Sequence, residues 1–268
     1  MTRIIAIANQ KGGVGKTTTT INLSASLARA GRNVLLVDLD PQGNATMGSG
    51  IEKTELVCSI YDLLTAQAGF SDVVTFADKA GYEILPANAD LTAAEVALLQ
   101  LEKKELILKL VLEENKDKYD FILIDCPPSL NMLTVNALVA ADSVLITMQC
   151  EYYALEGLTA LSETIQVIAE RFNPNLEIEG ILRTMYDPRN RLTLDVSKQL
   201  KEYFGDKVYR TVIPRNIRLA EAPSYGLPVM VYDKASRGAL AYIALAGEML
   251  RQYAKEENQK KLQRTLQE

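Results

Sequence analysis

The chain has 268 residues, of which 48% are hydrophobic, 24% charged and only 6% aromatic, and its formal net charge is −5. This length suits one large domain or two small ones, and the lack of an apolar run of about 18–20 residues excludes a membrane-spanning helix. The chain contains no histidine. Ser-His-Asp and Cys-His catalysis are therefore excluded, and any catalysis must use carboxylates, lysines, backbone amides and a hard cation.

Short apolar runs alternate with longer amphipathic segments along the chain. Buried strands are predicted at 3–8, 33–38, 82–87, 120–125, 143–148, 178–184 and 208–213. Helices are predicted at 17–29, from Thr92 (with Glu95 completing a capping box), and at 156–171, 193–204 and 237–253. This alternation predicts an α/β fold with one doubly wound, mostly parallel sheet covered by helices on both faces. We expect a single domain at 1–254 and a polar helix end or tail at 255–268.

The segment "NQKGGVGKTTT" (9–19) lies between the first predicted strand and the first predicted helix. A phosphate-binding loop GxxxxGK[ST] would occupy positions 10–17, although Gln10 replaces its first glycine and a second lysine, Lys11, follows. Lys16 is the lysine expected at the β- and γ-phosphates, and the Thr17 hydroxyl is expected to bind Mg²⁺. The glycines of this loop let backbone N–H groups approach phosphate oxygens closely (Gly12, Gly13 and Gly15). The segment therefore predicts a nucleotide site.

Carboxylates follow two further predicted strands. The second strand ends in "VDLDPQGNAT" (37–46), where Asp38 and Asp40 are two residues apart and would point the same way on an extended segment. The strand "DFILID" (120–125) ends in Asp125, as in a Walker B segment. Because ligands bind at the carboxyl ends of parallel strands, we expect these carboxylates to hold Mg²⁺ or to orient the attacking water.

The basic residues are unevenly distributed. Residues 181–220 contain nine basic and four acidic residues, a local charge of +5 that leaves −10 elsewhere. Arg189 and Arg191 lie in the polar loop "YDPRNRLT", and Arg215 and Arg218 flank a predicted turn. Such a segment permits an anion-binding face on an acidic protein. Nothing in it is typical of a base-reading recognition helix, so any DNA contact should be to phosphates and steeply salt-dependent.

The motifs together resemble the ParA/Soj family of chromosome-partitioning ATPases, within the group with a deviant Walker A motif, KGGxGK[ST]. The resemblance spans nearly the whole chain: "KGGVGKTTT", "LLVDLDPQGNAT", "ILIDCPPSL", "CEYYALEGL" (150–158) and "VIPRNIRLAEAPSYG" (212–226). "DPQGN" and "PRNIRLAEAPS" are more specific than the phosphate-binding loop. They favour ParA/Soj over its relatives.

The resemblance implies roles for individual residues. Lys11 is similar to the signature lysine that reaches the partner's phosphates in an ATP-bound sandwich dimer, and Gly12 to the glycine that lets the two loops approach. Asp40 matches the aspartate needed for hydrolysis, which makes Lys11, Lys16 and Asp40 the catalytic set. Metal binding is implied for Thr17, Asp40 and Asp125. Nucleotide binding is implied for Lys11, Gly12, Gly13, Val14, Gly15, Lys16, Thr17, Thr18, Pro41, Pro214, Arg215 and Asn216.

The resemblance also implies partners. Arg189 and Arg218 fall where Soj-like proteins carry DNA-binding arginines, so the ATP-bound homodimer is expected to bind double-stranded DNA without sequence preference. ATP and Mg²⁺ are the implied cofactors, and a ParB-type centromere-binding protein is the implied stimulator of a slow ATPase. The expected location is cytoplasmic and nucleoid-associated.

Three alternatives use the same fold. A MinD-like membrane-surface ATPase needs an amphipathic C-terminal helix, but the last fourteen residues offer only Leu262 and Leu266 as apolar anchors. A redox iron protein needs two suitably placed cysteines per chain, and the three cysteines follow no known ligand spacing (Cys58, Cys126 and Cys150). They are odd in number and form no CxxC, which favours a reduced cytosolic protein. A small-molecule kinase would need an acceptor pocket, and the sequence indicates none.

Overall fold

The computed structural model describes residues 2–265, which form one eight-stranded sheet in the order β3-β4-β2-β5-β1-β6-β7-β8. All neighbouring pairs are parallel except β3 with β4. The strands are β1 (Arg3–Ala8), β2 (Val34–Asp38), β3 (Thr75–Ala77), β4 (Tyr82–Leu85), β5 (Phe121–Asp125), β6 (Ser143–Gln149), β7 (Glu177–Tyr186) and β8 (Val208–Pro214). The predicted α/β fold with a mostly parallel sheet is confirmed.

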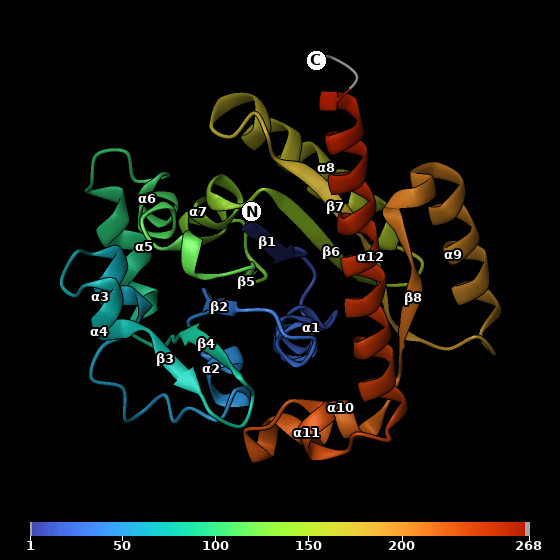
Figure 1. The fold of residues 1–268 in the computed structure, drawn as a ribbon, viewed down its shortest axis with the longest axis horizontal. Helices are drawn as coiled ribbons and strands as arrows, with labels where there is room; N and C mark the ends of the chain where they lie inside the picture. Colours follow the sequence, from blue (N-terminus) through green and yellow to red (C-terminus); the bar gives the residue numbers. More distant parts are fainter. Residues whose placement is uncertain (1, 266–268) are drawn as a thin grey trace.

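Helices cover both faces of this sheet (Figure 1). The α-helices are α1 (Lys16–Arg29), α2 (Asn44–Gly48), α3 (Ile60–Leu64), α4 (Phe70–Val73), α5 (Leu91–Leu99), α6 (Ile107–Glu113), α7 (Met132–Ala140), α8 (Ala154–Arg171), α9 (Arg191–Phe204), α10 (Ile217–Glu221), α11 (Val229–Tyr232) and α12 (Arg237–Thr265). The 3₁₀ turns are η1 (Lys116–Lys118), η2 (Gly205–Lys207) and η3 (Ala222–Tyr225).

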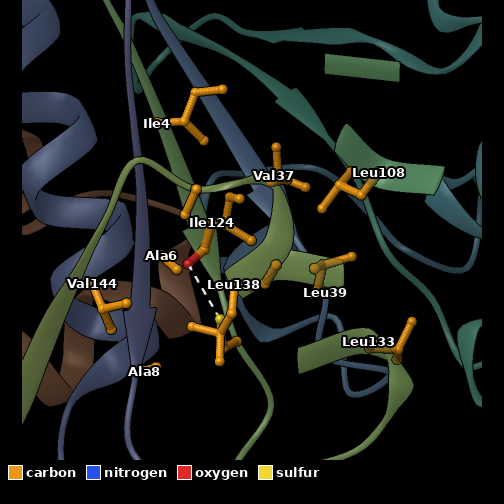
Figure 2. Close-up of a cluster of buried hydrophobic side chains, with 14 of the residues drawn as sticks. Ile4, Ala6, Ala8, Val37, Leu39, Leu108, Ile124, Leu133, Leu138 and Val144 are labelled. Carbon is orange, nitrogen blue, oxygen red and sulfur yellow. Dashed lines mark hydrogen bonds between the residues drawn. The ribbon is translucent and has the colours of Figure 1, made fainter. Parts of the chain in front are cut away.

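Successive apolar side chains of the central strands point to opposite faces of the sheet, and each face carries its own hydrophobic core. From β1, Ile4 and Ala6 belong to a core that includes apolar side chains of α3 and of α5 to α9, whereas Ile5 and Ile7 belong to a core that includes those of α1 and α12. Figure 2 shows part of the first core, where strand side chains such as Ile124 lie among helix side chains. Because β1, β2 and β5 are buried on both faces, their sequences are continuously apolar rather than alternating.

Some predicted boundaries need correction. The capping box at Thr92 and Glu95 is wrong: α5 begins at Leu91, and the Thr92 amide donates to Ala89 O inside the first turn. The Glu95 carboxylate instead accepts a hydrogen bond from the side chain of Asn131. Helix α12 continues to Thr265 rather than ending near 253, so the polar segment extends the helix through the described residues.

Leu266, one of the two apolar anchors weighed for membrane attachment, lies outside the described residues. Within residues 2–265, no helix combines the length and the apolar character needed to cross a bilayer. The three cysteines are free thiols, of which Cys126 and Cys150 are buried.

Candidate nucleotide site and basic surface

The carboxyl ends of β1, β2 and β5 meet at one edge of the sheet. Register places Ile7 opposite Asp125, and Asp125 in turn opposite Asp38. The loop predicted to bind phosphate leaves β1 at this edge and enters α1 at Lys16. Parallel pairing therefore brings together three sequence segments that are up to about a hundred residues apart, as their strand-end positions predict.

The loop presents backbone amides without internal acceptors. Gly13 and Gly15 adopt φ values of +71° and +85°, a region that L side chains rarely occupy, so glycine is required there. The first amide of α1 with a backbone acceptor is that of Thr19, which donates to Gly15 O at 2.9 Å. Across residues 2–265, the amides from Gly12 to Thr18 find no equivalent acceptor. Unpaired amides at a helix N-terminus bind anions, so the loop fits a phosphate chain.

Lys16 and Asp125 occupy the floor of the site. Lys16 is only 7% exposed, and burial lowers its pKa although the Asp125 charge acts in the opposite direction. Asp125 is fully buried; its Oδ1 accepts a hydrogen bond from the Thr20 hydroxyl at 3.0 Å. Its Oδ2 has no hydrogen-bond partner among the described residues. Burial, together with the neighbouring Asp38 carboxylate, raises the pKa of Asp125 to about 8. An orphaned carboxylate oxygen beside the Thr17 position fits a cation ligand.

The two aspartates after β2 have different surroundings. Asp38 is fully buried, and its carboxylate accepts hydrogen bonds from the Thr46 amide at 2.9 Å, the Thr46 hydroxyl at 2.8 Å and the Asp40 amide at 3.1 Å. Asp40 is partly exposed, and its Oδ1 accepts from the Gln42 amide at 3.0 Å. The strand ends at Asp38, so the two carboxylates do not form the matched pair expected from an extended segment. Asp38 stabilises the loop that carries Asp40.

A cavity of about 200 Å³ lies beside the phosphate-binding loop. Gly15 and Thr18 line one side of it, and the segment Pro214–Asn216 lines another, some 200 positions later in the chain. The remaining lining comes from Thr184, Met185, Ile213, Leu219, Ala220 and Tyr242. The structure thus brings Pro214, Arg215 and Asn216, for which the resemblance implies nucleotide binding, to the predicted phosphate loop. Pro41 is partly exposed after Asp40 and is not among the residues that line this cavity.

The additional lysine of the loop is engaged outside the phosphate cradle. The Lys11 ammonium forms an ion pair with Glu151 at 2.5 Å, and both side chains are about half exposed (56% and 49%). Its amide donates to Asn9 Oδ1 at 2.9 Å, and its carbonyl lies 3.5 Å from the Lys16 ammonium. A Cβ added to Gly12 would meet nothing within 4 Å. Neither residue therefore has a packing role within this chain.

Each of the two predicted DNA-binding arginines is already paired. Arg189 forms a bidentate pair with Asp187, with Nε–Oδ1 and Nη2–Oδ2 distances of 2.9 and 2.8 Å. Arg218 contacts Glu221 at 2.8 Å and Asp233 at 3.4 Å. The Arg189 side chain is 88% exposed and that of Arg218 is 46% exposed, so both remain within reach of a phosphate.

The basic segment 181–220 does not form one face. Arg183 is only 2% exposed and donates to the Ser197 hydroxyl and to the carbonyls of Tyr209 and Arg210. It is a core residue and is removed from the predicted anion-binding set. Lys198 and Lys207 pair with nearby glutamates. The local excess of positive charge is therefore smaller at the surface than the composition indicates.

This sheet, with its glycine loop, buried lysine and strand-end carboxylates, defines a P-loop nucleotide-binding protein of the deviant Walker A type. A family model described as an AAA domain matches residues 2–178. The sporulation initiation inhibitor protein Soj of Bacillus subtilis is 53% identical over 249 residues, which cover 93% of this chain and 98% of that one. The chromosome partitioning protein ParA of Caulobacter vibrioides is 50% identical, with 92% and 94% of the two chains covered. The chain belongs to the ParA/Soj family of chromosome-partitioning ATPases, as its motifs predict.

A solved structure gives the same fold. The chain is similar to cobyrinic acid a,c-diamide synthase from Mycobacterium smegmatis with bound ADP and magnesium, with a TM-score of 0.83 and 38% identity. The likeness covers 95% of this chain and 96% of the other.

Several site residues were not predicted from the sequence. The Thr184 hydroxyl donates to Val14 O at 2.8 Å and so ties β7 to the phosphate loop, but nothing in the β7 sequence indicates this contact. Gln149 approaches the loop at Gly13 O (3.4 Å). Glu151 begins the "EYYALEGL" part of a recognised motif, which could have identified it, although its pairing with Lys11 depends on the adjacency of β1 and β6.

Proposed function

We propose that this protein is an ATP-driven switch, in which Mg²⁺ and ATP are held between two copies of the chain and the closed dimer binds DNA without sequence preference. The observation that carries the proposal is Lys11, a signature lysine on the phosphate loop, whose ammonium forms only an exposed ion pair with Glu151 among the residues that the structure describes. One lysine, Lys16, already serves the phosphates of its own chain. A second is best explained by phosphates on another copy.

The chain's own groups account for nucleotide binding. The amides from Gly12 to Thr18 and the Lys16 ammonium would hold the phosphates, and the cavity beside Pro214–Asn216 would receive the base. Thr17 and Asp125, with Asp40, would hold the cation, which fits the unpaired Oδ2 of Asp125. Bound Mg²⁺ supplies neutralisation of charge on the phosphates. The similar synthase structure with ADP and magnesium supports this assignment.

Asp40 is the group assigned to hydrolysis. Its carboxylate is partly exposed and is fixed from two sides, because its amide donates to the buried Asp38 and its Oδ1 accepts from Gln42. This position allows the carboxylate to orient a water near the transferred phosphate. An exposed aspartate with no histidine nearby is a weak base, so the unstimulated ATPase should be slow. A ParB-type protein is the proposed stimulator, on the basis of the family alone.

Dimerisation provides the link to DNA. One chain offers only a few phosphate contacts, and each proposed arginine is paired with a carboxylate in this structure. Two such faces held in one dimer act at a high effective concentration, so weak single contacts become a measurable affinity. The contacts are to phosphates, so the affinity should fall steeply with salt. The protein would accordingly associate with the nucleoid in the ATP state.

The test compares DNA binding in four samples: wild type with ADP, wild type with ATP, and the Lys11→Ala and Arg218→Ala variants with ATP. We expect wild type to bind DNA with ATP and not with ADP. With ATP, the Lys11→Ala variant should not bind, and the Arg218→Ala variant should bind at least about tenfold more weakly than wild type. Equal affinity in all four samples would refute the switch.

The Asp187 carboxylate competes with DNA for Arg189, which gives a further prediction. Asp187→Asn removes a bidentate ion pair and should strengthen ATP-dependent DNA binding by up to about fivefold at low salt, since Arg189 would no longer be held by a carboxylate and exposed ion pairs are weak. Filter binding with a random duplex measures this change. Asp78→Asn, at an exposed site away from these arginines, is the matched control. Unchanged or weaker binding of the Asp187→Asn variant would remove Arg189 from the DNA surface.

A further inference from the structure

A groove runs along the outer edge of β8. This strand is last in the sheet order, so one of its edges has no neighbouring strand within residues 2–265. The groove has a volume of about 1160 Å³ and lies between the end of α9 with η2 on one side and the middle of α12 on the other. Figure 1 shows β8 lying between these two helices. A recess of this shape suits a partner that binds as a single extended chain better than a partner that binds through a broad surface.

Four cations contribute to the lining of the groove. Lys201 comes from α9, Arg210 from β8, and Arg251 and Lys255 from α12, and all four are exposed. None of the four forms an ion pair with another residue in the described part of the chain. Asp206 is one of two acidic residues in the lining. Four unpaired cations in one recess are notable in a chain whose net charge is −5.

The other acid, Glu248, is engaged by the backbone. Its carboxylate accepts hydrogen bonds from two successive amides of β8, those of Arg210 at 2.8 Å and Thr211 at 2.9 Å. Two consecutive amides face one carboxylate because the β7–β8 register shifts here, and Arg183 holds the carbonyls of Tyr209 and Arg210 from the other side. Both carboxylate oxygens of Glu248 are therefore occupied by backbone amides, and its charge leaves the lining with four cations against two acidic residues.

The α12 side of the groove adds apolar contact. Ile243 is 40% exposed on α12, and Ala244 and Gly247 follow it on the same helix. A bound chain would thus find apolar surface along α12 and positive charge on both sides of the groove. Peptide-binding grooves combine these two features, with contacts along the chain giving affinity and charges giving selectivity.

We propose that this groove binds an acidic, extended segment of a partner protein. A DNA duplex is the less suitable occupant, because its phosphates lie on a convex surface that would reach only the rim of the recess. The chain's own C-terminal residues are also unsuitable, since 259–264 carry Lys260, Lys261 and Arg264 and no acid.

The groove lies away from the nucleotide cavity. The groove is lined by residues from the first half of β8 (208–211), whereas the cavity is lined by residues 213–216, at and just beyond the carboxyl end of the strand. Binding in the groove should therefore be the same with ADP and with ATP. DNA binding by the proposed switch depends on ATP, whereas peptide binding in the groove should not. Either property can therefore be absent while the other is present.

The test uses the full chain and a fluorescein-labelled peptide of alternating glutamate and valine, with a glutamine-valine peptide as the uncharged probe. Fluorescence anisotropy should show binding of the acidic peptide and little binding of the uncharged one. The double variant Lys201→Glu/Arg251→Glu should weaken acidic-peptide binding by about tenfold or more, since charge reversal replaces attraction by repulsion. Lys79→Glu, at an exposed lysine on the opposite end of the sheet, should leave it unchanged.

Hydrogen–deuterium exchange locates the peptide. Slower exchange in residues 208–212 and 243–255 on addition of the acidic peptide supports the groove. The proposal would be overturned if the acidic peptide did not bind. It would also be overturned if the Lys79→Glu variant lost as much peptide affinity as the double variant, or if the peptide slowed hydrogen exchange only in other segments. Loss of DNA binding rather than peptide binding in the double variant would also overturn it, because the groove would then belong to the DNA surface.

Discussion

Lys11→Ala should leave nucleotide binding by the single chain within about threefold of wild type while abolishing ATP-dependent dimerisation and DNA binding. In this structure the Lys11 ammonium pairs with Glu151, and Lys16 is the buried lysine of the loop. A charge-assisted hydrogen bond contributes about 1.5–3 kcal/mol, and a symmetric dimer loses two of them, one from each copy. The dimer should therefore weaken by at least about a hundredfold. Isothermal titration with ADP and sedimentation velocity with ATP measure the two properties.

Two comparisons make this result specific. Lys79→Ala removes an exposed lysine far from the loop and should change neither property. Lys16→Ala should abolish nucleotide binding itself. If Lys11→Ala also abolished ADP binding by the single chain, then Lys11 would serve its own phosphates, and the dimer model would lose its main support.

Asp125→Asn should stabilise the protein without nucleotide and abolish its stabilisation by Mg²⁺ and ATP. Burial and the nearby Asp38 raise the pKa of Asp125 to about 8, and its Oδ2 accepts no hydrogen bond from the residues that the structure describes. The folded pKa lies above the unfolded value of about 4, so the native state keeps a proton that the unfolded state releases, and the free energy of unfolding falls as pH rises from about 4 to 8. Asparagine keeps an acceptor for Thr20 without the charge. We expect a gain of about 1–3 kcal/mol at pH 7.

Chemical denaturation at pH 4 and pH 7, with and without Mg²⁺ and ATP, checks this prediction. The gain should be small at pH 4, where the wild-type carboxyl is protonated in the native state. At a hundredfold excess of ligand over its Kd, wild type should gain about 2.7 kcal/mol and the variant much less. Asp78→Asn should behave as wild type throughout. A variant less stable at pH 7 than wild type, or one stabilised fully by Mg²⁺ and ATP, would contradict the assignment of Asp125 as a cation ligand.

Local sequence signals predicted most of the sheet. Continuous apolar runs identified β1, β2 and β5 because these strands are buried on both faces, and the glycine loop predicted the start of α1 within one residue. The short antiparallel edge strand β3 was missed, since three residues show no periodicity. The capping box at Thr92 failed because the turn through Ala89 and Asp90 starts the helix one residue earlier.

Site residues could be predicted where a local motif marks them. They could not be predicted where contacts between distant segments of the chain place a residue in the site. Gly15, Lys16 and Asp125 were identified because their chemistry at a strand end is distinctive. Thr184 was not, because its contact with Val14 depends on strand order. Arg183 was misassigned for the same reason: an arginine in a basic segment gives no sign that bulged carbonyls of β8 will bury it.

Sedimentation velocity of the wild-type protein with a short random duplex tests the central claim most directly. With Mg²⁺ and ATP, we expect a dimer that sediments with the DNA at low salt and dissociates from it as the salt concentration is raised. With Mg²⁺ and ADP, we expect a monomer and free DNA. A monomer that binds DNA equally in both nucleotides, or a dimer that persists with ADP, would contradict this claim.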